Sequence, residues 1–116
     1  MIKHVDDRPD AFSHINGQYA WFELFDSSDS LYAYLAIQMG VINAETHIEM
    51  VKWSNGIRKQ LMNSELPKVK AMSKKNGIEK LVFKKLAPDQ KWERFIRLLG
   101  ASEPVTYMAS YLETTK

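Results

Sequence analysis

The chain has 116 residues, a length typical of one domain, with 45% hydrophobic and 26% charged residues and a formal net charge of +2 at pH 7. This composition excludes a disordered chain, and so small a net charge does not favour a nucleic-acid partner. Because the chain has no cysteine, disulfides, a thiol nucleophile and a zinc–thiolate site are excluded.

The N-terminal sequence gives no sign of targeting to a membrane. No apolar run approaches the roughly 20 residues that a membrane-spanning helix needs. The first residues, MIKHVDDRPD, lack the apolar core of a signal peptide. We therefore expect a cytoplasmic protein with no membrane partner.

The charges are distributed unevenly along the chain. Most acidic residues of the first half precede residue 30, whereas the second half is rich in lysine and arginine, among them Arg58, Lys59, Lys68, Lys70, Lys74 and Lys75. The plainer explanation is a solvated helical face, and the alternative is an anion-binding site.

The first half of the chain reads mainly as strands. Residues 1–17 are predicted to be an irregular or partly helical lead-in, because Pro9, Gly17 and a polar cluster interrupt any long pattern. Two aromatic or apolar runs, 19–25 and 31–38, predict two strands joined as a hairpin. Residues 44–51 alternate between apolar and polar, which predicts a third strand.

A helix follows the third strand. Ser54 or Asn55 is an acceptable N-cap, and Ile57 and Leu61 begin an apolar stripe that continues to Asn76. Pro67 falls inside this stripe, where it removes a backbone hydrogen bond, so the sequence predicts a kinked helix or two consecutive helices.

The last third reads as strand, helix and strand. An apolar run at 81–83 predicts a buried strand, and helical spacing of Trp92, Phe95, Ile96 and Leu99 predicts a second helix that stops at Gly100. Residues 105–112 alternate as a final strand. The order predicts one α/β (α+β) domain over 1–116, with a mixed, mainly antiparallel central sheet flanked by helices.

This order resembles the GCN5-related N-acetyltransferase (GNAT) fold. The residues that carry the resemblance are Asp89, Phe95 and the sequence Leu99-Gly100-Ala101, followed by the strand at 105–112. The resemblance implies binding of acetyl-coenzyme A and acyl-coenzyme A-dependent N-acetylation of an amine on a protein or small molecule. More narrowly, the chain resembles small acetyltransferase-like proteins of short-tailed phages, which implies a phage-encoded protein in the host cytoplasm or the virion.

The resemblance also implies a cofactor-binding loop. In the family, backbone N–H groups at the start of the core helix hold the pyrophosphate, as free amides at a positive helix end can. The matching residues are Ser54, Asn55, Gly56, Ile57, Arg58 and Lys59, and Asp89 matches a family asparagine. Only Gly56 of the family's glycine pattern is present, and Arg58 and Lys59 are the candidate phosphate partners. The alternative is that residues 54–56 simply cap the helix.

The implied catalytic residues lie on two strands. The family's general base is a carboxylate on the strand before the core helix, which indicates Glu45 and Glu49, on one face with His47. The family's general acid, a tyrosine in the second helix, is replaced here by Ile96. Tyr107 and Tyr111 on the following strand could substitute if one points into the cleft, and Tyr107 is the candidate we select. The alternative for Glu45, His47 and Glu49 is an exposed polar strand face, and the alternative for either tyrosine is packing within its strand. Alternate strand positions do not close a metal site, so no metal is predicted.

The missing tyrosine leaves a second function open. The protein would then be a catalytically inactive GNAT-fold phage protein, acting as a virion component or as a protein-binding inhibitor of a host defence system. Its interface would use exposed aromatic residues, namely Trp21, Phe22, Tyr32 and Tyr34, and the alternative is that these aromatics belong to the core. A third option is a nucleic-acid binder that uses the Lys-rich helix. The acetyltransferase interpretation requires the strands that carry His47 and Phe83 to be neighbours.

Overall fold

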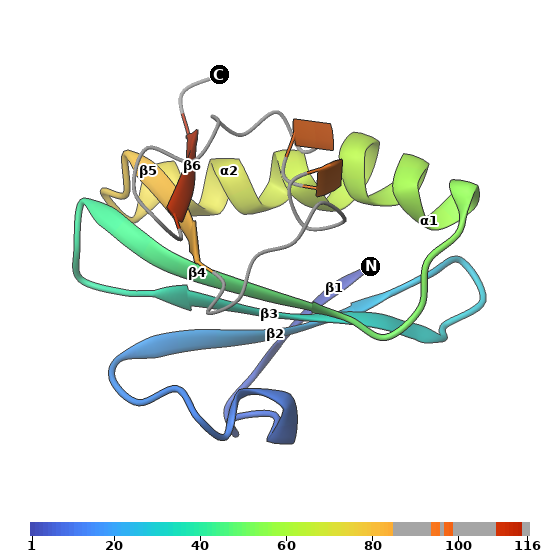
Figure 1. Ribbon diagram of the computed structural model, residues 1–116, viewed down its shortest axis with the longest axis horizontal. Helices are drawn as coiled ribbons and strands as arrows, with labels where there is room; N and C mark the ends of the chain where they lie inside the picture. The colour runs from blue at the N-terminus through green and yellow to red at the C-terminus, as the bar shows by residue number, and fades with distance from the viewer. Residues whose placement is uncertain (85–93, 96, 99–108, 115–116) are drawn as a thin grey trace.

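A six-stranded sheet forms the centre of the molecule, in the computed structural model of the chain (Figure 1). The structure describes residues 1–84, 94–95, 97–98 and 109–114. The strands lie side by side in chain order: β1 (Ile2–Val5), β2 (Tyr19–Phe25), β3 (Leu31–Gln38), β4 (Asn43–Met50), β5 (Lys80–Lys84) and β6 (Ala109–Glu113). Only β4 and β5 run parallel, and the other neighbours are antiparallel. The predicted fold class is thereby confirmed.

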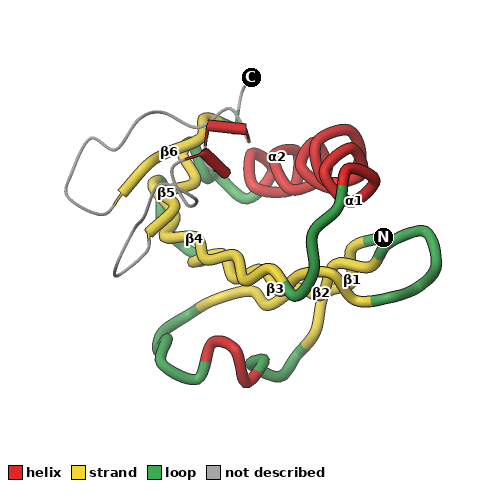
Figure 2. The backbone as a smooth tube through the Cα atoms, turned by 45° about the vertical axis from the view of Figure 1, so that its right-hand side comes forward, coloured by secondary structure: helices red, strands yellow, loops and turns green. Residues whose placement is uncertain are grey.

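One helical rod carries the chain from β4 to β5 across one face of the sheet. It consists of α1 (Asn55–Gln60), a π-helical segment η2 (Leu61–Glu65) and α2 (Leu66–Lys75). Figure 1 shows the rod lying along the sheet, and in Figure 2 all of it stays on the same side. A parallel pair needs such a crossover because a tight turn can join only antiparallel strands.

The main core lies between this rod and the sheet. Alternation along β3 and β4 points Leu35, Ile37 and Ala44 at the helix, where Leu61 and Val69 meet them. All five side chains are buried. Each buried leucine, isoleucine or valine here adds roughly 1.5–3 kcal/mol of stabilisation, so this layer holds the crossover in place.

Of the predicted kinked helix or two consecutive helices, the structure has the second: α1 and α2 follow one another, joined by η2 into one rod that continues through Pro67. A proline lacks an N–H and its ring clashes with the carbonyl four residues earlier in an α-helix. Here the five residues before Leu66 adopt the wider π-helix, and Pro67 follows in the first turn of α2, so the irregular turn falls where proline removes an α-helical hydrogen bond. The sequence indicated that Pro67 conflicts with an α-helix, but not that a π-helical segment would accommodate it.

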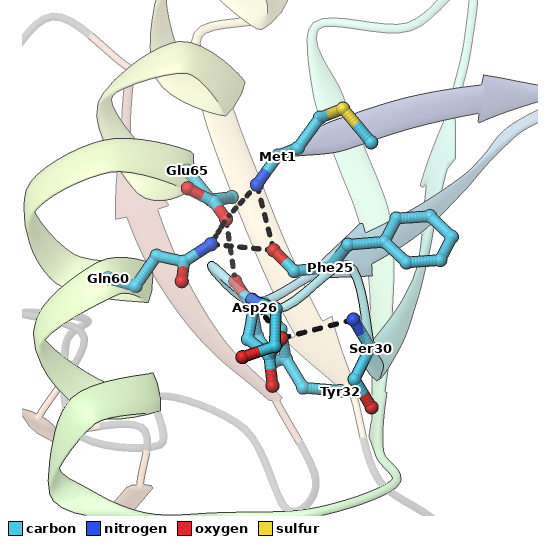
Figure 3. A network of polar contacts seen from close by, with 8 residues as sticks. Met1, Phe25, Asp26, Ser30, Tyr32, Gln60 and Glu65 are labelled. Carbon is cyan, nitrogen blue, oxygen red and sulfur yellow. Dashed lines mark hydrogen bonds and ion pairs between the residues drawn. The ribbon is translucent and has the colours of Figure 1, made fainter.

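The π-helical segment also brings Gln60 and Glu65 onto the same side of the rod. Gln60 Nε2 donates to Glu65 Oε1, which also accepts from Tyr32 Oη at 3.2 Å and from the Met1 ammonium at 3.0 Å (Figure 3). The Met1 ammonium also donates to the Phe25 carbonyl at 2.8 Å. Glu65 is fully buried, and these donors all meet its Oε1 atom, whereas Oε2 is buried with no hydrogen-bond partner among the described residues.

The lead-in covers the opposite face of the sheet and is more regular than predicted. Residues 2–5 form β1, paired antiparallel with β2, and Asp10–Phe12 form one 3₁₀ turn, η1. Figure 2 shows η1 on the side of the sheet away from the helical rod. The expectation of an irregular segment is wrong for β1, because four residues with two polar side chains are too short for a period-two signal. The partly helical expectation is confirmed by η1.

Two of the four aromatic residues considered for an interface are buried, as the core alternative predicts. Phe22 pairs in register with Leu35 on the helix side of the sheet. Tyr32 is the extra residue of a β-bulge between β2 and β3, which turns its side chain onto the same side. Trp21 and Tyr34 are half-buried. The expected exposed aromatic interface is therefore wrong for Phe22 and Tyr32. No helix in the described part of the chain is long and apolar enough to cross a membrane.

Candidate active site

The parallel pair β4–β5 frames the candidate site. Its register matches Asn43 with Lys80 and ends with Thr46 opposite Phe83. β4 continues to Met50, still paired with β3. The expected neighbourhood of the strands that carry His47 and Phe83 is confirmed. His47 is the first β4 residue beyond the register with β5. The two strands therefore part at His47, and the β4 backbone groups that point away from β3 lie next to this place.

Glu45 and His47 form a polar pair at this point, on the face away from the helical rod. His47 Nε2 lies 3.4 Å from Glu45 Oε2, and the Tyr19 hydroxyl donates a hydrogen bond to the same carboxylate oxygen. The Glu45 backbone N–H donates to Gln38 Oε1 at 3.1 Å. Both side chains of the pair are partly exposed, so the carboxylate is oriented by neighbours while water or a substrate still has access to it.

Aromatic rings surround the pair. The His47 ring packs at 5.9 Å from Tyr19 and 6.4 Å from Phe12, and Tyr19 stacks on Trp21 at 5.4 Å between centroids. Phe12 comes from η1, whose position is held by Arg8, which donates to the Ile15 carbonyl at 2.8 Å. The lead-in thus supplies one apolar wall beside the Glu45–His47 pair.

The Tyr19 phenol is held in its protonated form. Burial raises the pKa of Tyr19 above its ordinary value, and the hydrogen bond to Glu45 and the negative charge of that carboxylate raise this pKa further. A phenol with such a pKa is a poor proton donor to a leaving group near neutral pH. Tyr19 therefore acts as a hydrogen-bond donor that positions Glu45.

The other predicted catalytic residues are placed differently. Glu49 lies on the same face of β4 as Glu45, opposite Tyr34 in the register, and is exposed. Tyr107 and Asp89 lie outside the described residues. Among the described residues, no group of three or more His, Asp or Glu side chains is arranged to hold a metal ion. Of the two predicted carboxylates, the structure brings Glu45 into a polar cluster with His47.

The predicted cofactor loop is the N-terminus of α1. Ser54 is extended, with φ −158° and ψ 170°, and its hydroxyl accepts from the Ile57 N–H at 3.1 Å. The helix cap that the sequence allowed is thus present. The Ile57 amide is thus paired with Ser54, and the Ile57 side chain is buried in the core. The amides left at the helix start are those of Asn55 and Gly56, which have no intrahelical acceptor by geometry.

Two observations fit an anion at this helix start. A Cβ placed on Gly56 would meet only Ser54 Oγ, at 3.8 Å, so the space over this amide is open. The Arg58 Nε atom is buried and has no hydrogen-bond partner among the described residues. Lys59 is exposed beside it. A phosphate group on these amides would give the guanidinium a charged acceptor.

Trp53 is a large exposed side chain that directly precedes this loop in the sequence. It is 45% exposed, and its ring meets Phe95 edge to face at 5.6 Å. Phe95, with Arg94, Arg97 and Leu98, is helical, as the spacing of the second predicted helix requires. The contact joins the turn after β4 to this second helical segment.

Sequence reasoning missed Tyr19 and Phe12 as parts of the site. The run YAWFELF marked a strand, but which of its side chains faces Glu45 depends on the registers of β2 with β3 and of β3 with β4. Tyr19 pairs with Gln38, which in turn accepts from the Glu45 amide. Only the alternation of Tyr19 and Trp21 on one strand face was available as a signal.

Comparison with solved structures supports the GNAT fold. A chain of the AtaT–AtaR complex bound to DNA superposes with a TM-score of 0.66 at 16% identity, covering 99% of this chain and 95% of its own. The spermidine/spermine N-acetyltransferase SpeG from Vibrio cholerae gives a TM-score of 0.63 at 14% identity, covering 92% and 73%. The Campylobacter jejuni N-acetyltransferase PseH, in complex with acetyl coenzyme A, gives 0.58 at 13%, covering 86% and 71%.

These likenesses concern the fold alone, because all three identities are low. The chain matches no protein-family model and no curated protein sequence. The expected GNAT-like architecture is nevertheless confirmed across nearly the whole chain. Two of the neighbours, in the KacTA and AtaT–AtaR complexes, are bound to DNA, so the expectation that a nucleic-acid partner is unlikely is not confirmed.

Proposed function

We propose that the protein is an N-acetyltransferase that takes an acetyl group from acetyl-coenzyme A and transfers it to an amine of a protein or small molecule. The observation that carries this proposal is the Glu45–His47 pair at the point where β4 leaves its register with β5. The parallel β4–β5 unit, its crossover helix and the GNAT-like architecture support it.

The residues at the start of α1 are suited to hold the coenzyme. The amides of Asn55 and Gly56 and the positive end of the helical rod would bind the pyrophosphate, with Arg58 and Lys59 as charged partners. Acetyl-coenzyme A supplies a thioester whose carbonyl carbon accepts a nucleophile.

The Glu45–His47 pair is suited to prepare that nucleophile. An amine is protonated near pH 7 and must lose a proton before its nitrogen can attack a carbonyl. Glu45, oriented by Tyr19 and next to His47, accepts that proton directly or through one water. The acid that returns a proton to the coenzyme thiolate would be Tyr107. A phage source and the alternative role as virion component or inhibitor stay predictions from the sequence resemblance.

A thermal-shift titration tests coenzyme binding. A ligand at about 100 times its Kd stabilises the folded state by about 2.7 kcal/mol, which corresponds to an increase in Tm on the order of 10 °C. Gly56→Asp places a carboxylate over the open amides, so we expect it to abolish the shift. Asn63→Asp adds the same charge at an exposed position of the same rod and should keep the shift.

Activity is measured separately from binding. Glu45→Gln should retain the acetyl-coenzyme A shift and lose acetyl transfer to a panel of amines. The proposal is wrong if millimolar acetyl-coenzyme A leaves the Tm of the folded wild-type chain unchanged, or if Glu45→Gln transfers acetyl groups at the wild-type rate.

A further inference from the structure

The exposed side of the helical rod carries positive charge only. Between Asn55 and Lys75 the single acidic residue is Glu65, and it is fully buried beneath the rod. The basic residues in the same span are Arg58, Lys59, Lys68, Lys70, Lys74 and Lys75. The small net charge of the chain conceals this local excess, because the acidic residues lie elsewhere.

Four of these lysines are available to a partner. Lys59, Lys68, Lys74 and Lys75 are exposed, and none of them forms an ion pair with any residue that the structure describes. The opposite side of the rod is anchored in the core by Ile57, Leu61 and Val69. The rod therefore presents the lysines outward on a rigid support.

The chemistry of this face favours nucleic acid over a lipid surface. Besides the lysines, its exposed positions are Asn63, Pro67 and Ala71, so it offers no large apolar side chain to insert between lipids. The distance from Lys59 to Lys75 is about 24 Å at 1.5 Å per residue. A duplex carries one negative charge per about 1.7 Å of its axis, so phosphates lie along the whole span from Lys59 to Lys75.

We propose that this lysine face, formed by Lys59, Lys68, Lys74 and Lys75, binds the phosphate backbone of a nucleic acid without selecting its base sequence. The face has lysines to contact phosphates but no exposed arginine, asparagine or glutamine pair to read base edges, apart from the single amide of Asn63. The inference does not depend on acetyl transfer.

Fluorescence anisotropy with the full chain and a labelled short DNA duplex tests the proposal. Four phosphate contacts predict that log Kd rises with log salt concentration at a slope of about 3.6. The double variant K68Q/K75Q removes two contacts and should lower that slope by about 1.8. Circular dichroism checks that the helix content is unchanged, as expected for exposed positions.

K3E is the matched control. One Lys→Glu change and two Lys→Gln changes lower the net charge equally. Lys3 is exposed on β1, on the face opposite its neighbour Ile2, which packs on the helix-side core. K3E should bind the duplex with the wild-type slope.

Three results would overturn the proposal. The first is binding whose affinity does not change with salt, or no binding at low salt. The second is an equal decrease of the slope in K3E, which would show that binding depends on the net charge and not on the lysine face. The third is binding to phosphatidylserine vesicles but not to the duplex or a labelled RNA hairpin, which would identify a lipid partner.

Discussion

Glu45 is the residue on which the proposed chemistry depends, and its neighbours decide whether it can act. A carboxylate on an exposed strand face is ordinarily mobile and solvated. Here the Tyr19 hydroxyl holds one of its oxygens, and the His47 ring lies 3.4 Å away from the same atom. Hydrogen bonds to a charged group contribute roughly 1.5–3 kcal/mol, enough to fix the orientation of this side chain.

Tyr19→Phe tests this positioning. The ring and its stacking on Trp21 remain, but the donor to Glu45 is lost. We expect kcat for acetyl transfer to fall about tenfold, equivalent to about 1.4 kcal/mol, with KM for acetyl-coenzyme A nearly unchanged. Tyr34→Phe, on the same sheet face, is the control and should keep the wild-type kcat. Equal kcat values for the two variants would show that Tyr19 does not position the base.

The unit of β4, α1 and β5 is the element on which both parts of the site depend. Its existence was predictable, because alternation in β4, a capping serine and an apolar run at 81–83 are local signals. The parallel direction of β5 was not predictable, since a strand–helix–strand order permits an antiparallel return. The π-helical segment could not be predicted either, because Pro67 shows only that an ordinary α-helix is disfavoured.

Ser54 can be used to separate the cap of α1 from coenzyme binding. Its hydroxyl caps the helix, so Ser54→Ala should lower the free energy of unfolding by about 1 kcal/mol. Asp caps a helix as well as Ser, so Ser54→Asp should keep the wild-type stability. Its charge would nevertheless repel the pyrophosphate, and the thermal shift with acetyl-coenzyme A should disappear. Urea unfolding and the thermal-shift titration measure the two effects.

A Ser54→Asp protein that keeps both its stability and its coenzyme shift would show that residues 54–56 are a helix cap and nothing more. This was the alternative that the sequence left open. A loss of both properties would instead mean that the carboxylate fails to cap the helix, and Ser54→Asn then supplies the uncharged comparison.

At the scale of the whole molecule, the contacts that join distant segments were the hardest to predict. The sheet could be predicted strand by strand, whereas the Glu65 cluster joins Met1, Tyr32 and Gln60, which are far apart in the sequence. In the sequence, Glu65 lies in the segment around Pro67 that interrupts the apolar stripe, and no local pattern indicates its burial or its partners. The same limit hid Phe12 and Tyr19, whose places depend on register rather than on local pattern.

The Glu65 cluster predicts how stability depends on pH. Burial on its own raises the pKa of Glu65, but the hydrogen bonds from the Met1 ammonium, Gln60 and Ser64, together with the charge of that ammonium, outweigh burial and hold it below the ordinary value of 4.5. The folded state therefore binds this proton more weakly than the unfolded state does. The contribution of Glu65 to stability is present above pH 4.5 and is lost as the pH falls through the lowered pKa.

Urea unfolding at a series of pH values measures this contribution. The free energy of unfolding of the wild-type chain should fall with decreasing pH below about 4.5, and part of that fall should be absent in Glu65→Gln, which cannot titrate. Glu79→Gln is the control, because Glu79 is exposed and its substitution removes the same charge. If Glu65→Gln and Glu79→Gln show the same pH dependence as the wild type, the buried carboxylate does not couple folding to protons. If Glu65→Gln alone flattens the curve, the buried carboxylate couples folding to protons.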